Sequence, residues 1–389
     1  MAFAVFLAVT AIAMLGPLLV DMAAAMDTTV PVAGQLVTTA AVAWAITALM
    51  VGPFSDTYGR KPVLLTGTCF LAAGSLGMGM APSFAVATGC SILTGMGGGM
   101  VPPTCVALIG DIFPAQRQPT SIPFLTMQPG LSSVLGVPLA AVLGDFAGWR
   151  TPFLILGMAL LFTTIILFLL VPYERPEATR LNLAGRLRQV AAVPVTWCMA
   201  GTNLLARVTW GVVITFFPAY LIVTYGWKTL EVALPVAIVA IGATAAPLLA
   251  GRIGRSSRRL SATAALLLAA AVPGLGIFFL SWGAWLSVSM ACIFMLLVVP
   301  VTTVLMILLA EIGGAARGAL AGVISFSNWS GTALGAAMGG VLVAQFGFTS
   351  LSFLLVGAIL GSGMLMAFTV NDKAAARARK HFSTPPEQQ

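Results

Sequence analysis

Residues 52–61 read Gly-Pro-Phe-Ser-Asp-Thr-Tyr-Gly-Arg-Lys, and they separate two apolar runs at residues 34–53 and 62–80. Each run has about the 20 residues that a helix needs to cross a bilayer. Gly59 supplies the turn between the runs, and the two basic residues that end the stretch carry charges that the anionic cytoplasmic leaflet attracts. The stretch therefore predicts a tight cytoplasmic connector between two membrane-spanning helices.

The composition of the whole chain supports this interpretation. Of its 389 residues, 59% are apolar and only 8% are charged, whereas an ordinary soluble domain has about 25% charged residues. A soluble protein this poor in charge would have to cover its surface with carbon, so a soluble enzyme is excluded. No cluster of polar catalytic groups appears inside the apolar runs, so we do not expect a membrane enzyme either.

The apolar runs predict an all-α membrane protein with twelve membrane-spanning helices. The runs lie near residues 3–25, 34–53, 62–80, 84–110, 121–143, 151–171, 194–223, 231–251, 261–282, 286–309, 319–344 and 351–370. The first run has no basic residues before it and is longer than the apolar part of a usual signal peptide, so we expect it to be retained as a helix.

The connectors divide the chain into four parts. One connector is long enough to be a linker, and its segment 181–190 has the spacing of an amphipathic helix at a membrane surface. We expect two six-helix bundles, a cytoplasmic linker containing that helix and a polar cytoplasmic tail, at residues 1–172, 193–370, 173–192 and 371–389 respectively.

The positive charges predict the orientation of the helices. Sixteen of the 19 Lys and Arg residues lie in the connectors after even-numbered helices, in the linker or in the tail, whereas the odd-numbered connectors hold only Arg150 and Lys228. By the positive-inside rule both termini are cytoplasmic. This distribution accounts for the net charge of +8 without a nucleic-acid partner.

Metal and cofactor chemistry finds little support in the residues. The five cysteines all lie in apolar runs and form no Cys-x-x-Cys pair, and the one histidine, His381, lies in the tail. We therefore expect no disulfide, no metal site and no cofactor. No nucleotide-binding motif is present, so transport, if any, takes its energy from a gradient or from the substrate.

The second half of the chain repeats the first at an offset near 200 residues. Asp111 and the arginine six positions later are matched by Glu311 and Arg317, and Phe153–Gly157 (FLILG) is matched by Phe353–Gly357 (FLLVG). Two duplicated halves of the same orientation are a design of secondary transporters, in which similar bundles enclose a site near the membrane midplane.

The first stretch also resembles a family signature. Gly52, Asp56, Gly59, Arg60 and Lys61 match the G-x-x-x-D-x-x-G-R-[KR] motif of the major facilitator superfamily, at the position where that family has it. The resemblance implies two pseudo-symmetric six-helix bundles. It also implies a cytoplasmic latch, in which Asp56 and Arg60 engage the acidic residue that ends the fourth helix, here Asp111. The second copy has Arg255 where the acid would stand, so the latch is asymmetric.

The fifth helix resembles a motif of the twelve-helix drug:proton antiporters of that superfamily. Its residues Gly130, Gly136, Pro138 and Gly144 are typical of close helix packing with a proline kink, although Val137 separates the usual Gly-Pro pair. Generic packing explains these glycines as well. The fourth helix departs from the antiporter pattern, because Ser91 stands where the family's coupling arginine is expected.

Arg207 lies near the middle of the seventh predicted helix. A charge there is costly and normally faces a polar cavity, and Asn203, Arg207 and Trp210 share one helix face. We predict these three residues as a substrate-binding group that suits an anion. The alternative is a structural arginine that caps carbonyls or reaches Asp21 or Glu231. Asp21, near the cavity mouth, is the candidate proton carrier, although a solvated helix end is an equal alternative.

These observations favour a secondary transporter in a bacterial inner membrane, monomeric and surrounded by lipid. Proton-coupled efflux of drugs or lipophilic compounds is the first hypothesis. A transporter of a small organic anion bound by Arg207 is the alternative, and a sensor or scaffold that does not transport is the second alternative. Five tryptophans are expected to be interfacial anchors: Trp44, Trp197, Trp282, Trp285 and Trp329.

Overall fold

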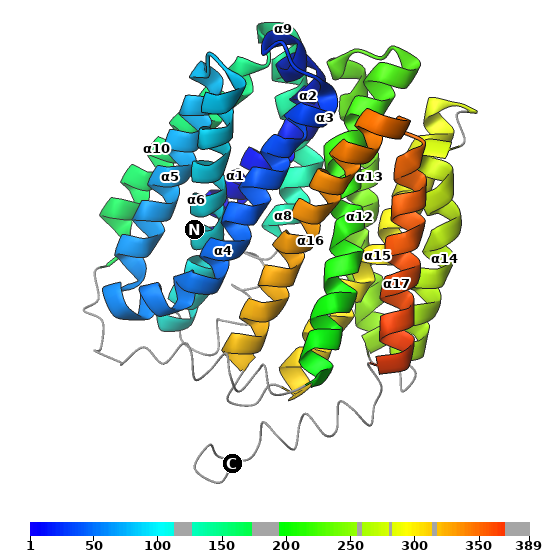
Figure 1. Ribbon diagram of the computed structural model, residues 1–389. Helices are drawn as coiled ribbons and strands as arrows, with labels where there is room; N and C mark the ends of the chain where they lie inside the picture. Colours follow the sequence, from blue (N-terminus) through cyan, green and yellow to red (C-terminus); the bar gives the residue numbers. More distant parts are fainter. Residues whose placement is uncertain (113–126, 173–193, 255–258, 280–281, 313–316, 370–389) are drawn as a thin grey trace.

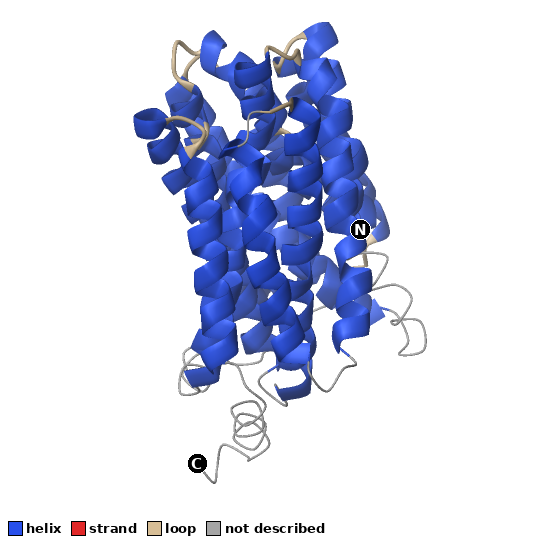
Figure 2. Ribbon diagram, turned by 90° about the vertical axis from the view of Figure 1, so that its right-hand side faces the viewer, coloured by secondary structure: helices blue, strands red, loops and turns tan. Residues whose placement is uncertain are grey.

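The structure is a computed structural model that describes the chain except residues 113–126, 173–193, 255–258, 280–281, 313–316 and 370–389. The described residues fold into long helices joined by short turns, and none of them forms a strand (Figure 2). The predicted linker with its amphipathic segment and the predicted C-terminal tail lie outside the described residues.

The N-terminal half forms one bundle, coloured blue to green-cyan in Figure 1. Its helices are α1 (Ala2–Ala13), α2 (Leu15–Ala25), α3 (Val30–Ala33), α4 (Gln35–Tyr58), α5 (Arg60–Met80), α6 (Phe84–Ile112), α8 (Gln128–Leu131), α9 (Val137–Ala147) and α10 (Arg150–Leu170), with a π-helical turn η1 (Ser132–Gly136) between α8 and α9.

The C-terminal half forms a second bundle beside the first (Figure 1). Its helices are α12 (Pro194–Tyr225), α13 (Thr229–Gly254), α14 (Arg259–Phe279), α15 (Ala284–Ile312), α16 (Arg317–Phe346) and α17 (Ser350–Thr369). Both bounds of α15 are shifted by 200 residues from those of α6, which agrees with the repeat found in the sequence. The all-α fold of two related bundles is confirmed.

The helices have the length and polarity of membrane spans. Ten described helices are long and apolar enough to cross a bilayer, and eleven if the bent pair α1 and α2 is counted as one span. The remaining helix, α16, is 30 residues long, and it carries Ser325, Ser327, Asn328 and Ser330 in its middle. These polar residues lower its hydropathy, as expected for a helix in the interior of the molecule rather than in lipid.

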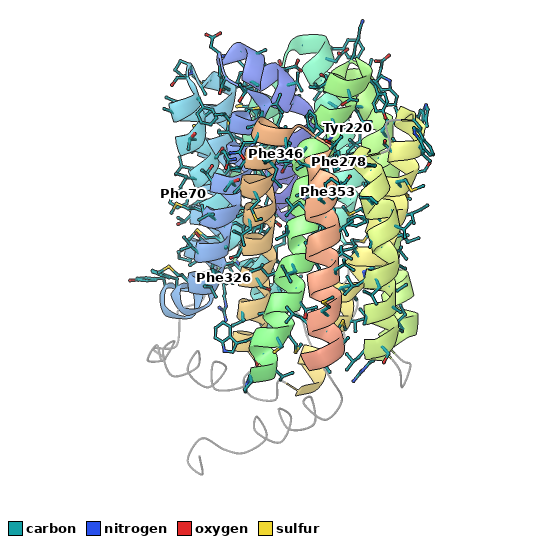
Figure 3. All side chains as sticks on the ribbon, turned by 45° about the vertical axis from the view of Figure 1, so that its right-hand side comes forward. Phe70, Tyr220, Phe278, Phe326, Phe346 and Phe353 are labelled. Atoms are coloured by element: carbon teal, nitrogen blue, oxygen red, sulfur yellow. The ribbon has the colours of Figure 1, made fainter. Side chains whose placement is uncertain are left out.

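Each bundle packs around its own apolar core. The C-terminal core includes Phe216, Phe278 and Phe294, and Tyr220 packs edge-on against Phe278 at 5.1 Å between ring centroids (Figure 3). Other large apolar side chains, such as Leu170 of α10, are exposed. In a membrane protein such residues face lipid.

The molecule has two ends, which differ in the residues found there. The basic end is where α4 gives way to α5 at Arg60, and the Asp21 end is the opposite one, where α2 ends and α13 begins. The N-terminus lies part-way along the height of the N-terminal bundle (Figure 1), and Met1 packs against its core. The cytoplasmic position expected for both termini stays a prediction.

The first predicted helix differs from a straight span. It is broken at Met14, where α1 and α2 meet at 45°. Pro17 explains the break, because proline has no N–H and its ring clashes with the carbonyl four residues earlier, here that of Ala13. The predicted kink at Pro138 takes another form, since the π-turn η1 precedes it and adjusts the helix without a sharp bend.

Candidate functional site

A partly open pocket lies between the two bundles, and the space not filled by atoms, its open mouth included, is about 500 Å³. Its wall comes from α1 and α2, from the segment η1–α9, and from α12, α13 and α15, so both halves of the chain contribute. The lining residues are apolar except for Ser133 and the indole nitrogen of Trp210: Ala13, Pro17, Ser133, Val137, Trp210, Val213, Ile214, Phe217, Pro218, Val236, Val239, Ala240, Ala243 and Met295.

Two prolines shape the wall of this pocket. Pro17 produces the bend that separates α1 from α2, and Pro218 lies inside the long helix α12. Because Pro218 has no N–H, the carbonyl of Ile214 loses its partner in the helix. This carbonyl lies against Gly16 of the other bundle, so closely that a Cβ atom on residue 16 would collide with it. The two bundles therefore touch backbone to backbone beside the pocket.

Arg207 lies one helical turn from the pocket, toward the basic end. The Cζ atom of its guanidinium is 5.0 Å from the ring centroid of Trp210, a distance at which a cation is attracted to the ring face. Its Nε atom is buried and has no hydrogen-bond partner, and no described carboxylate forms an ion pair with it. Arg207 does not itself line the pocket, but it contacts a residue that does.

Asn203 is placed differently from the sequence-based expectation. Its side chain is fully buried, and its amide nitrogen donates to Ser327 Oγ at 2.7 Å and to Asn328 Oδ1 at 2.8 Å. Its oxygen accepts a hydrogen bond from Thr302 Oγ1 at 3.1 Å. The amide thus joins α12 to α15 and α16. It is on the predicted face, but its hydrogen-bonding groups are used by the protein.

Asp21 lies near the C-terminal end of α2 and is half-buried. Its Oδ2 atom accepts a hydrogen bond from Thr229 Oγ1 of α13 at 3.0 Å. The contact joins the two bundles, so Asp21 is neither a freely solvated helix end nor a partner of Arg207.

The predicted latch residues are only partly described. Gly59 joins α4 to α5 with φ of +92°, a conformation that favours glycine, and Arg60 Nη1 donates to Ser55 Oγ at 2.9 Å. Gly52 and Asp56 lie in the last two turns of α4, and Asp111 lies in the last turn of α6, but their side chains fall outside the described residues. Lys61 lies over the Phe168 ring, 5.0 Å from its centroid.

The glycines of the fifth helix lie at two kinds of contact. Gly136 and Gly144 face α1 and α2 within the same bundle, where an added Cβ would be 2.5 Å from Thr10 Oγ1 and from Leu18 Cδ2 respectively. Gly130 faces the other bundle, where an added Cβ would be 2.9 Å from Thr244 of α13. Pro138 opens α9 just after the π-turn, next to the pocket residue Val137.

Several residues of the site were not predicted from the sequence. Val236, Val239, Ala240 and Ala243 give α13 an apolar stripe at helical spacing, but in a membrane helix such a stripe looks the same whether it faces lipid, a core or a pocket.

Trp44 was expected at the membrane interface, and this expectation was wrong. It is 3% exposed and stacks on Trp329 of α16 at 3.9 Å between ring centroids.

The comparisons with known proteins agree with the fold. Residues 1–331 match the family model described as Major Facilitator Superfamily. A D-xylose-proton symporter has a TM-score of 0.80 and 15% identity, with 96% of this chain and 97% of that chain covered. A bacterial homolog of the human lysosomal transporter Spinster, in an inward-facing and unoccupied conformation, has a TM-score of 0.68 and 16% identity, with 99% and 97% covered.

Relatives among curated proteins match over shorter segments. The uncharacterized MFS-type transporter YceJ of Bacillus subtilis is 28% identical over 185 residues, which cover 47% of each chain. The multidrug resistance protein Stp of Mycobacterium tuberculosis is 31% identical over 153 residues, 38% of this chain and 28% of that protein. These matches span about half or less of each relative. With the family model matching most of its length, the chain belongs to the Major Facilitator Superfamily.

Proposed function

We propose that this transporter exports lipophilic small molecules by alternating access, in exchange for protons. The apolar pocket between the bundles carries the proposal. Both bundles contribute to its wall, and apolar side chains make up nearly all of that wall, as in sites that hold drug-sized ligands. A wall of aliphatic and aromatic side chains binds by removing apolar surface from water, at roughly 25 cal/mol per Å², and does not demand one arrangement of polar groups.

Contacts at the Asp21 end support the alternating-access part of the proposal. There Gly16 packs on the Ile214 carbonyl, Gly340 of α16 packs on Gln35 of α4, and Asp21 accepts its hydrogen bond from Thr229. All three join one bundle to the other. For the pocket to open toward that side, these contacts have to separate together, as in two bundles that rock about a central site.

Asp21 is the proposed proton carrier. Its hydrogen bond with Thr229 of the opposite bundle makes the carboxyl group part of the contact that keeps this end closed, so a proton taken up there acts directly on that contact. At the basic end we propose that Asp56, Arg60 and Asp111 form the latch implied by the family motif. The relative named multidrug resistance protein Stp supports efflux of drugs.

The alternative substrate, a small organic anion, is supported by Arg207, because its guanidinium has no ionic partner among the described residues and a buried Nε without a hydrogen bond. Family membership makes the chain a transporter, so the sensor hypothesis is not carried further. We also propose that the protein acts as a monomer in a bacterial inner membrane with both termini cytoplasmic, on the basis of its charge distribution.

Flux in proteoliposomes tests the proposal. Purified protein is reconstituted, and uptake of ethidium, of a neutral naphthyl dye and of naphthalene carboxylates is recorded with and without an imposed pH gradient. We expect the pH gradient to drive transport of a lipophilic compound in the direction opposite to the flow of protons. Absence of protein-dependent flux of every lipophilic compound, with correctly folded protein in the vesicles, would overturn it.

A further inference from the structure

We propose that Arg207 and the apolar pocket form a single site whose preferred substrates are lipophilic monoanions. The apolar body of such a substrate occupies the pocket, and its acidic group binds the guanidinium. This inference rests on the proposed function, since it takes the pocket as the transport site. The two candidate substrate classes then share one site, because the pocket binds the lipophilic part of a compound and Arg207 binds its negatively charged group.

Trp210 connects the two parts. It lines the pocket, and its ring centroid is 5.0 Å from the Cζ atom of Arg207. Arg207 precedes Trp210 by three residues, which is about 4.5 Å along a helix. An acidic group therefore has to extend past one indole ring to pass from the pocket to the guanidinium. A carboxylate that is joined to an aromatic ring by a short linker can extend this far beyond the ring.

Two side-chain donors, one near the middle of α12 and one on α16, have no hydrogen-bond partner among the described residues. The Nε atom of Arg207 is buried and unpartnered. Asn328, which is half-buried on the facing helix α16, has its oxygen engaged by Asn203, and its amide nitrogen makes no hydrogen bond with the described residues. Leaving a buried charged donor without a partner is unfavourable. A carboxylate or sulfonate is the ligand that a guanidinium fork fits.

The position of Arg207 is held firmly, as a binding group requires. The backbone of α16 approaches closely, since an added Cβ on Gly331 would be 2.8 Å from Cβ of Arg207. One turn away, the hydrogen bonds of Asn203 to Ser327, Asn328 and Thr302 join α12 to its two neighbours. Asn203, predicted as a substrate ligand, acts in this proposal as a positioning residue for Arg207.

The charge balance excludes a structural ion pair as an explanation among the described residues. Asp21 is bound to Thr229 at the Asp21 end, and Glu231 Oε2 accepts a hydrogen bond from the backbone N–H of Lys228 at 2.7 Å. Both carboxylates are therefore engaged at the start of α13 rather than at the middle of α12. No carboxylate in the described part of the chain pairs with the guanidinium, so it is available to a ligand.

Calorimetric binding of a matched pair of compounds tests the inference. The probes are 1-naphthaleneacetate, a lipophilic monoanion, and 1-naphthaleneacetamide, its neutral analogue of nearly equal shape, with the full-length protein in lipid nanodiscs and empty nanodiscs as the blank. We expect the wild-type protein to bind the acid about tenfold more tightly than the amide. In Arg207→Met this preference disappears, because the affinity for the acid falls about tenfold further than the affinity for the amide, and Arg207→Lys keeps most of the preference.

Equal affinities for acid and amide in the wild type, or an acid preference that survives in Arg207→Met, would overturn the inference. If Arg207→Met fails to bind the amide, Arg207→Gln, which keeps hydrogen-bonding atoms without charge, decides between the same two outcomes. The proposed function fails separately, through absence of flux in proteoliposomes, because binding of the acid at Arg207 does not require transport. Flux of neutral compounds without a preference for the acid would overturn this inference alone.

Discussion

Trp44 of the N-terminal bundle stacks on Trp329 of the C-terminal bundle, with 3.9 Å between ring centroids and 23° between ring planes. Trp44 is buried between this ring and Gly98 of α6, where only a residue without Cβ leaves room for the indole. The pair lies along the contact of α4 with α16, further toward the basic end than the contact of Gln35 with Gly340. It is thus an aromatic contact across the surface along which the bundles must move.

The stacked pair should couple energetically. Replacement of both residues by Leu is expected to be less destabilising than the sum of the single replacements, by about 0.5–1.5 kcal/mol, because the first replacement already removes the interaction. The measurement is the free energy of unfolding in detergent for the four proteins of the cycle. Trp282, which is 81% exposed, serves as the matched control: Trp282→Leu combined with Trp329→Leu should be additive. A coupling energy of zero for the stacked pair would refute this relationship.

Gly16 should be indispensable for closing the Asp21 end. In Gly16→Val the new side chain meets the Ile214 carbonyl of the other bundle, so the closed arrangement is disfavoured and the rate of flux should fall by at least about tenfold, equivalent to roughly 1.4 kcal/mol.

The matched control is Gly357→Val in α17, where an added Cβ has nothing within 4 Å. Flux in proteoliposomes is normalised to the amount of monodisperse protein. Equal rates in the two variants would show that close approach at Gly16 is not needed for transport.

Gly59 should contribute to stability through its backbone conformation. With φ of +92° and ψ of 157°, an alanine at this position adopts a strained region that costs roughly 1–3 kcal/mol. Gly59→Ala is therefore expected to lower the free energy of unfolding by this amount, whereas Gly89→Ala, at a helical glycine with open space around it, should not lower it. Loss of stability in both variants, or in neither, contradicts the expectation.

Asp21 should couple transport to the proton gradient. In Asp21→Asn the carboxyl group that takes up the proton is gone, so an imposed pH gradient should no longer accelerate flux, while exchange of substrate between the two sides continues. Thr229→Val removes the hydrogen bond to Asp21 but keeps the carboxyl group, so it should weaken the response without abolishing it. Asp27→Asn, at an exposed residue of the connector that follows α2, is the control. A normal gradient response in Asp21→Asn would remove Asp21 from the mechanism.

The number and order of the helices could be predicted from the sequence because a bilayer sets their length and excludes charge. The bend at Met14 could not be predicted from the sequence. Whether Pro17 bends the helix sharply or only slightly depends on how the helix packs against its neighbours. The face of α13 that lines the pocket could not be identified from the sequence, since lipid and an apolar pocket favour the same apolar side chains, here Val239 and Ala240.

The partners of single residues were harder to predict than the faces on which they lie. Helical spacing places Asn203 on one face with Arg207, but its hydrogen-bond partners at Ser327 and Asn328 are more than 120 residues away in the sequence. A tryptophan such as Trp44 looks the same in the sequence whether its ring lies at a membrane interface or stacks inside the protein. Only the three-dimensional arrangement separates these cases.

The most direct test of alternating access at the central pocket is the accessibility of residue 240 from both sides of the membrane. Ala240 lines the pocket and is 6% exposed. A single cysteine is placed there after the natural cysteines Cys69, Cys90, Cys105, Cys198 and Cys292 are replaced by alanine. A membrane-impermeant maleimide is then applied to sealed vesicles of each orientation. We predict labelling from both sides, and a lower rate of labelling when a transported compound is bound. Labelling from one side only, or a rate that no transported compound changes, would contradict a pocket that opens alternately to the two sides.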